Sequence, residues 1–238
     1  MTIRYALYPV IALIALPGVA ALAENRINTQ RPDAPELAAY GDLPVGVRQI
    51  ELSDPGRIDI LAIDPAADKP AQMPTYDRPL TVEVWYPAAA DATGSTTFQT
   101  YLRDGTTEVD VEGRAMRDAA PAQADEPYPL VLVSHGYPGN RFLMSHLAEN
   151  IASKGYVVAA WGAPHGTLAI HQAGSDSHEQ MLDPRIKTAV AFGPWGMNTG
   201  FWDAEGLKGV QIPMLFIAGS QDETSLYEKG VRAICSPS

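Results

Sequence analysis

The sequence predicts an α/β fold with a mostly parallel sheet, and three consecutive patterns carry that prediction. Residues 130–133 form a continuous apolar, β-branched run, which is typical of a strand buried on both faces. After a glycine-rich turn, residues 142–154 show helical spacing, and Gly155 is a natural helix stop. The side chains on one face of the expected helix are Phe142, Leu143, His146, Leu147 and Ile151. Residues 156–160 form a second buried strand, so the unit implies a right-handed parallel crossover.

Three strand patterns precede this crossover. Residues 47–52 alternate as a half-buried strand does, residues 58–63 are similar, and residues 80–86 show the strongest pattern. Pro87 ends the third strand because proline cannot donate to a ladder. We therefore expect three strands in the first part of the sheet.

The segment between these strands and the crossover, residues 88–128, holds few large apolar groups. Residues 101–117 could include a short helix. We expect the whole segment to be a surface excursion, which could carry substrate contacts and is more often a solvated loop.

The later chain resumes the strand pattern. Residues 186–192 and 214–218 are predicted to be buried strands, and each ends in a glycine-containing loop. Residues 226–234 could begin a final helix. Residues 47–238 are therefore expected to form a single domain.

Composition excludes several classes of function. The net charge of −11 argues against nucleic acid or an anionic membrane surface as a partner. Cys235 is the single cysteine, so no intrachain disulfide can form. The spacing of His165, His171 and His178 is too irregular for a zinc motif, and we expect no metal.

The N-terminus carries a leader pattern. Arg4 precedes an apolar run over residues 5–20, and Ala21-Leu22-Ala23 is a small-x-small cleavage pattern. We expect residues 1–23 to be a signal peptide and the mature chain to be periplasmic or secreted, without a stable membrane anchor. The alternative is an uncleaved anchor, since the run is near the lower limit for spanning a bilayer. Residues 24–46 then form an extended segment.

Several motifs together resemble α/β-hydrolases. They are a buried strand ending in His-Gly at 135–136, Gly-Asn-Arg at 139–141, Lys-Gly-Tyr-Val-Val at 154–158 and Val-Glu-Val-Trp-Tyr-Pro at 82–87. The chain is most similar to the dienelactone-hydrolase-like and platelet-activating-factor-acetylhydrolase-like esterases. The resemblance covers most of residues 47–234. It implies antiparallel strands at the start of the sheet and helices on both faces.

The resemblance also implies an oxyanion loop at His135, Gly136 and Tyr137, with the backbone N–H of Tyr137 as the donor. Such a donor stabilises the oxyanion of a tetrahedral intermediate, typically by roughly 3–4 kcal/mol. The alternative is a tight turn without a catalytic role.

The nucleophile of this class is not found. The family's serine lies in Gly-x-Ser-x-Gly, where only small neighbours fit the strained turn. Ser134 comes closest, but Leu132 stands where the first glycine is needed, and Ser175 and Ser177 lie in a polar run typical of caps or loops. The nucleophile therefore stays unassigned.

Spacing gives a reason for this absence. About two dozen residues separate residue 160 from residue 186, and a strand with its crossover takes roughly thirty. The interval holds one crossover where the resembled fold needs two. Residues 167–174 resemble the helix after the missing serine, which suggests an internal deletion beside Gly162, Pro164 and Gly166.

Besides the serine, the catalytic triad of this class needs a histidine as base and a carboxylate that orients the histidine. By resemblance Asp222 is the triad acid, although it could simply cap its turn or the next helix. No histidine follows His178, so the triad histidine is absent.

These residues favour a carboxylic ester hydrolase by resemblance, acting on a small-molecule ester or acyl ligand without metal or organic cofactor. We expect little or no activity, because two of the three catalytic groups are missing. One alternative is a non-catalytic protein that binds acyl compounds in a cleft beside Tyr137, Trp161 and Trp195. Another is a fragment that does not fold stably, because a lost central strand leaves unpaired sheet edges.

Overall fold

The computed structural model describes residues 33–64, 71–102, 104–136, 139–161, 183–195 and 207–235, together with positions 29, 66 and 197. The strands are β1 (Val45–Ile58), β2 (Thr75–Pro87), β3 (Thr97–Tyr101), β4 (Glu108–Glu112), β5 (Met116–Arg117), β6 (Leu130–Ser134), β7 (Val157–Trp161), β8 (Ala189–Phe192) and β9 (Met214–Ile217). The described helices are α1 (Ser145–Ala152), α5 (Val231–Cys235) and the short 3₁₀ helices η1 (Glu36–Ala38) and η2 (Ile60–Ala62).

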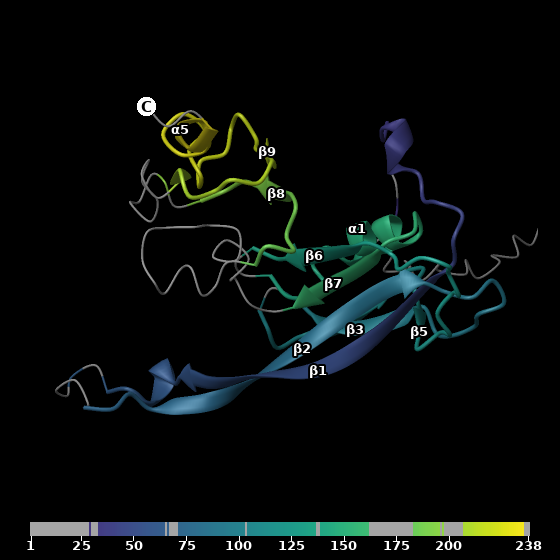
Figure 1. The fold of residues 1–238 in the computed structure, drawn as a ribbon, viewed down its shortest axis with the longest axis horizontal. Coiled ribbons are helices and arrows are strands. Elements are labelled where there is room, and N and C mark those ends of the chain that lie inside the picture. The colour runs from purple at the N-terminus through teal and green to yellow at the C-terminus, as the bar shows by residue number, and fades with distance from the viewer. Residues whose placement is uncertain are drawn as a thin grey trace, which may run out of the picture.

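Five strands form one mixed sheet in the order β5-β1-β2-β7-β6. The pairs β1–β2 and β2–β7 are antiparallel, whereas β6 and β7 are parallel and α1 lies between them in the sequence. Figure 1 shows α1 against the sheet beside β7, and α1 contacts both β7 and β2. The predicted crossover and the antiparallel strands at the start of the sheet are thus confirmed.

The sheet buries its apolar side chains on the face that α1 covers. Side chains alternate between the two faces of a strand, so Val47, Trp85, Val158 and Ala160 all point to this side. Each of the four is at most 5% exposed, and Ala148 and Ala152 of α1 pack against them. This cluster is the core of the described part of the chain.

The prediction that residues 130–133 are buried on both faces is wrong. Val131 and Val133 pack against the core, but Leu130 and Leu132 on the opposite face are 61% and 48% exposed. β6 ends the strand order, and in the described part of the chain nothing covers this face of it enough to bury those leucines.

The crossover helix begins later than predicted. Its buried residues are Ser145, Ala148, Glu149 and Ala152. Residues 141–144 form a turn instead, which leaves Leu143 48% exposed, while Phe142 is buried by stacking on Phe98 at a ring distance of 4.9 Å. Gly155 ends the helical segment as expected, because its φ of +92° is accessible to glycine.

Residues 88–128 are more ordered than the predicted surface excursion, and the helix considered within 101–117 is wrong. β3 and β4 pair as an antiparallel hairpin, and β5 adds to the edge of β1. Ala115 and Ala119 are buried. The residues after the hairpin therefore contribute to the core, which their small side chains do not reveal in the sequence.

Two further strand predictions need correction. Residues 58–63 are not a strand, because β1 ends at Ile58 and η2 follows with Asp59 as its cap. β8 and β9 exist, but they form a separate parallel sheet (Figure 1) and are not fully buried. One face of this pair leaves four side chains 44–59% exposed, namely Val190, Phe192, Leu215 and Ile217. The final helix, α5, starts only at Val231.

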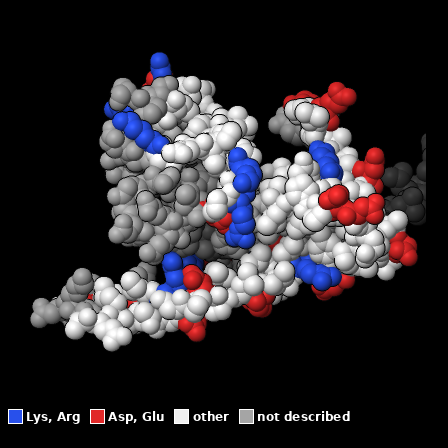
Figure 2. All heavy atoms as spheres, in the orientation of Figure 1, with Lys and Arg blue, Asp and Glu red and all other residues white. Residues whose placement is uncertain are grey.

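The outer halves of β1 and β2 extend beyond the sheet as a two-stranded arm, residues 51–58 and 75–81, because β7 pairs with β2 only from Val82 to Trp85. Figure 2 shows this arm projecting from the rest of the molecule. On the same view, basic side chains are separated by uncharged and acidic surface.

The described residues contain no helix that is long and apolar enough to cross a bilayer. The expected signal peptide, residues 1–23, lies outside the described residues, so cleavage and export stay predictions. Within the segment 24–46, η1 is held near α1, since the backbone oxygen of Ala38 accepts a hydrogen bond from the Asn150 side chain at 2.8 Å.

Glu149 makes the stability of this fold depend on pH. Its side chain is 1% exposed, and Oε1 accepts hydrogen bonds from the backbone N–H groups of Arg114 at 3.0 Å and Ala115 at 3.1 Å. Burial raises the pKa of Glu149 above its ordinary value, and these two bonds oppose that shift. The folded chain therefore keeps this proton to a higher pH than the unfolded chain does.

We expect the Glu149→Gln variant to lose part of this pH dependence. An acid whose folded pKa is raised contributes a stability that falls as pH rises from the ordinary value of 4.5 through the folded pKa. Glutamine keeps the accepting oxygen but has no proton to release. Thermal melts between about pH 4 and pH 8 should show the variant gaining stability relative to wild type as pH rises. If the stability of the variant and of the wild type changed with pH in the same way, this prediction would be wrong.

Candidate active site

The loop after β6 begins with His135 and Gly136, two of the residues that the resemblance assigns to the oxyanion loop. His135 Nδ1 lies 2.9 Å from the backbone oxygen of Gly136, which can only accept, so Nδ1 carries the proton and donates it. Nε2 is shielded from solvent and has no hydrogen-bond partner among the described residues. Tyr137 lies outside the described residues, so its N–H stays a prediction.

The same loop closes on itself at Gly139. The Gly139 N–H donates to the Gly136 oxygen at 2.6 Å. A side chain at Gly139 would have its Cβ 2.7 Å from that oxygen and 2.7 Å from Leu143 Cδ2, closer than real Cβ atoms approach. Position 139 therefore requires glycine for space.

Asn140 fixes the end of the turn. Its Oδ1 accepts from the backbone N–H of Phe142 at 2.8 Å, and its backbone oxygen accepts from Leu143 at 3.0 Å. Its Nδ2 donates to Thr100 Oγ1 at 3.3 Å, which joins the loop to β3. We call residues 135–142 the β6 loop.

Beneath the β6 loop lies a buried carboxylate that the sequence prediction missed. Glu83 of β2 is 0% exposed and forms ion pairs with Arg117 of β5 and with Arg141 of the loop. The Arg141 Nε lies 3.4 Å from Glu83 Oε2. The sequence indicates that Glu83 is buried, because Glu83 lies two positions before Trp85 and its side chain therefore points to the same buried face of the strand.

Asp222 lies on the loop after β9, as the resemblance predicts. Its Oδ1 accepts from the backbone N–H groups of Thr224 at 2.9 Å and Ser225 at 2.8 Å. Both hydrogen bonds lower the pKa of Asp222, and the bond from Ser225 has the larger effect. The carboxylate therefore caps its own turn, which is the structural alternative to the triad role, and among the described residues no hydrogen bond joins it to a histidine.

The loop of Asp222 is tied to the end of β8. Ser225 is 4% exposed, and its Oγ donates to the backbone oxygen of Gly193 at 3.1 Å. A Cβ built on Gly193 would lie 3.5 Å from Asp222 Oδ2. The acid loop is thus placed by β8 and β9, whereas the β6 loop is placed by the five-stranded sheet.

The nucleophile stays unassigned among the described serines. Ser134 is exposed at the end of β6, opposite Trp161 of β7. Ser145 is 0% exposed and its Oγ has no hydrogen-bond partner among the described residues. Ser175 and Ser177 lie outside the described residues, as do His165, His171 and His178.

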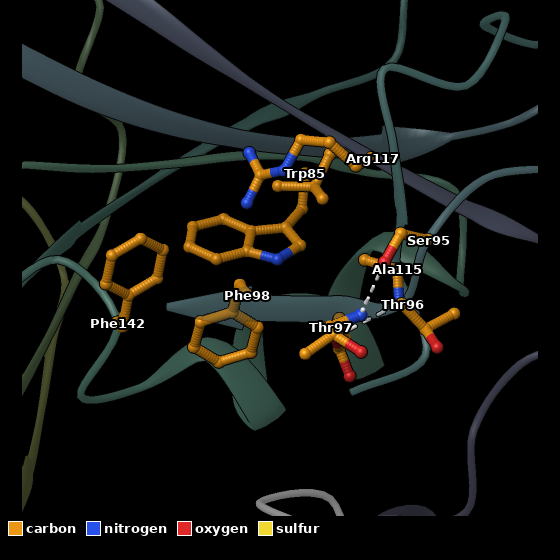
Figure 3. Close-up of a pocket in the computed structure, with 10 residues that line it drawn as sticks. Trp85, Ser95, Thr96, Thr97, Phe98, Ala115, Arg117 and Phe142 are labelled. Carbon is orange, nitrogen blue, oxygen red and sulfur yellow. Dashed lines mark hydrogen bonds between the residues drawn. The ribbon is translucent and has the colours of Figure 1, made fainter. Parts of the chain in front are cut away.

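Figure 3 shows a small cavity on the α1 side of the sheet, where Trp85, Phe98 and Phe142 converge. Its volume is about 10 Å³, enough for one water molecule at most. A substrate does not fit there. The cavity is also away from the expected cleft, since neither Trp161 nor Trp195 lines it.

Within the described residues, no group of three or more His, Cys, Asp and Glu side chains is arranged to hold a metal ion. The described site residues offer a loop held by hydrogen bonds at the end of β6 and a carboxylate on a separate loop.

Comparison with known proteins agrees with the esterase resemblance over part of the chain. Residues 74–166 match the sequence model of the family "platelet-activating factor acetylhydrolase, isoform II". This stretch runs from β2 through β7 and includes the whole β6 loop. It supports a relationship with α/β-hydrolase-type esterases.

Among solved structures, a ferulic acid esterase from Streptomyces cinnamoneus is similar to this chain at 18% sequence identity and a TM-score of 0.45. The similarity covers 76% of this chain and 75% of the esterase. It is too loose to bear on function. A comparison with curated proteins gives no match.

Proposed function

We propose that this chain is a carboxylic ester hydrolase of the dienelactone-hydrolase-like class in which acyl transfer to water is impaired. The observation that carries the proposal is the β6 loop, which is closed on itself, joined to β3 and contained in the stretch that matches the esterase family. Its substrates would be small esters, and the reaction would need neither metal nor organic cofactor.

In this proposal the β6 loop supplies the oxyanion donor and Asp222 is the acid. The N–H after Gly136 would face the carbonyl oxygen of an ester bound at the end of β6, where charge develops during attack. The printed sequence contains no Gly-x-Ser-x-Gly serine and no histidine after His178. In a site without such a serine, a bound ester would meet an oxyanion donor but no activated nucleophile.

The impairment agrees with the arrangement of the strands. In the described part of the chain, β6 ends the five-stranded sheet, and β8 pairs only with β9. The loops that would carry the oxyanion donor and the acid therefore belong to two sheets, with no described strand between them. An internal deletion in the interval 161–186 accounts for this separation. Export to the periplasm or beyond is part of the same proposal.

The test combines turnover with active-site labelling. The mature chain, after a cooperative melt confirms that it folds, is incubated with p-nitrophenyl acetate and p-nitrophenyl butyrate and, separately, with a fluorophosphonate probe. We expect no hydrolysis above that of the Ser134→Ala variant and no stoichiometric adduct by intact mass. A stoichiometric adduct, located by peptide mapping, would overturn the impairment and identify the nucleophile.

A binding arm tests the alternative class. p-Nitrobutyranilide keeps the acyl group of the butyrate ester but resists hydrolysis, so calorimetry can measure its affinity without turnover. Weak, millimolar binding fits an impaired hydrolase. Binding at micromolar concentration without turnover would instead indicate a non-catalytic protein that binds acyl compounds.

A further inference from the structure

Glu83 is a buried charge with two partners. A carboxylate that is 0% exposed is costly to bury unless both oxygens are matched by charge or hydrogen bonds. Here Oε1 pairs with Arg117 and Oε2 pairs with Arg141. The two arginines come from different segments, one from β5 and one from the β6 loop, so one buried charge holds two parts of the chain against β2.

Arg141 is held in three directions. Its Nε points to Glu83, and its second terminal nitrogen donates to Gln49 Oε1 on β1 at 3.4 Å. Its guanidinium carbon Cζ lies over the ring of Phe142, 4.5 Å from the ring centroid. A planar guanidinium group with partners at its edge and on its face has little freedom to rotate. The ammonium group of lysine cannot reproduce this geometry.

These contacts fix the end of the β6 loop that the strand does not fix. The N-terminal end, at His135, continues directly from β6. The C-terminal end is the turn at Asn140, and Arg141 follows it immediately. The loop is therefore attached to the sheet at both ends, once through the backbone and once through a buried ion pair.

We propose that Arg141, anchored by buried Glu83, is the positioning residue that holds the described end of the β6 loop, residues 139–142, against the sheet and thereby places the oxyanion donor that the proposed function assigns to this loop. Arg141 does not touch the reacting atoms; it acts through the backbone of the loop. A role of Arg141 in catalysis rests on the proposed function. Its effect on the order of the loop can be measured even if the chain does not hydrolyse esters.

Arg117 offers a matched control. It pairs with the other oxygen of the same carboxylate, and its exposure of 29% is close to the 30% of Arg141. Replacing either arginine by methionine removes one positive charge and one ion pair from Glu83 while keeping a long apolar stem. Only Arg141→Met removes an anchor of the β6 loop.

Amide hydrogen exchange, measured by mass spectrometry on the full chain, tests the proposal. The amides to follow are those of Gly139, Phe142 and Leu143, whose hydrogen bonds close the loop. We expect Arg141→Met to speed their exchange roughly tenfold or more while α1 and β7 stay protected, and Arg117→Met to leave them near wild type. Equal acceleration in both variants, or none in Arg141→Met, would overturn the proposal.

Arg141→Lys keeps the test decisive if Arg141→Met fails to fold. Lysine retains a charge for Glu83 but loses the contact with Gln49 and the stack on Phe142, so a smaller acceleration confined to the loop is expected. Protection equal to wild type in this variant would count against the proposal. If the wild-type chain hydrolyses esters, Arg141→Met should lower kcat and leave KM unchanged, and an unchanged kcat would overturn the catalytic meaning alone.

Discussion

Replacing Trp85 by alanine is expected to lower the free energy of unfolding by about 3–5 kcal/mol, the usual cost of truncating a buried aromatic side chain. Trp85 is 2% exposed and belongs to the core between the sheet and α1. It also lines the small cavity with Phe98 and Phe142, so the truncation would enlarge an existing void (Figure 3). Urea unfolding followed by circular dichroism measures the change.

Leu132→Ala is the control for this prediction. The sequence places Leu132 in a strand buried on both faces, but its side chain is 48% exposed. We expect a loss of about 1 kcal/mol, well below that of Trp85→Ala, because only about half of its apolar area leaves water on folding. A loss as large as that of Trp85→Ala would mean that the outer face of β6 is covered in solution.

Gly139→Ala is expected to cost about 1–3 kcal/mol, the range typical of an added group in a packed site. The new Cβ would approach the Gly136 oxygen and Leu143, and it would also lie 3.1 Å from His135 Nδ1. The turn must open to admit it, which breaks the hydrogen bond from Gly139 to Gly136. Urea unfolding gives the stability, and hydrogen exchange of the β6 loop reports the opening.

The neighbouring glycine provides the comparison. Among the described residues, no atom lies within 4 Å of a Cβ built on Gly136, and the φ of Gly136 is not in the left-handed region. Gly136→Ala should therefore change stability by less than about 0.5 kcal/mol. If the two variants behaved alike, the loop would have a different conformation from the one described.

The strands β2 and β7 could be predicted because their signals are local. Alternation in residues 80–86 and the apolar run at 156–160 are properties of neighbouring residues in the sequence. Gly155 likewise marks the end of the helical segment through its own backbone preference. The mixed α/β sheet and the crossover result from these elements and their order.

Burial was harder to predict where it depends on partners far along the chain. The run at 130–133 looks like any central strand, but β6 lies at the end of the strand order, and Leu130 stays exposed. The segment 88–128 looks like a solvated loop, but the β3–β4 hairpin and β5 bring Ala115 into the core. In both cases the neighbours decide burial, and they lie dozens of residues away.

The candidate site likewise contains residues that the sequence predicts and contacts that depend on partners far along the chain. His135, Gly136 and Asp222 were predicted from motifs, because each lies in the loop that follows a strand that the sequence reveals. The role of Arg141 could not be read from its own motif, since its partner Glu83 lies 58 positions earlier.

The sequence by itself therefore determined the strands β2 and β7, the end of the crossover helix and the position of the β6 loop. Only the tertiary structure decided which strand is an edge, which face is covered and which charges meet. The physical reason is that propensity and turn chemistry act between neighbours, whereas a buried carboxylate such as Glu83 is stable only beside the two arginines that the fold brings to it.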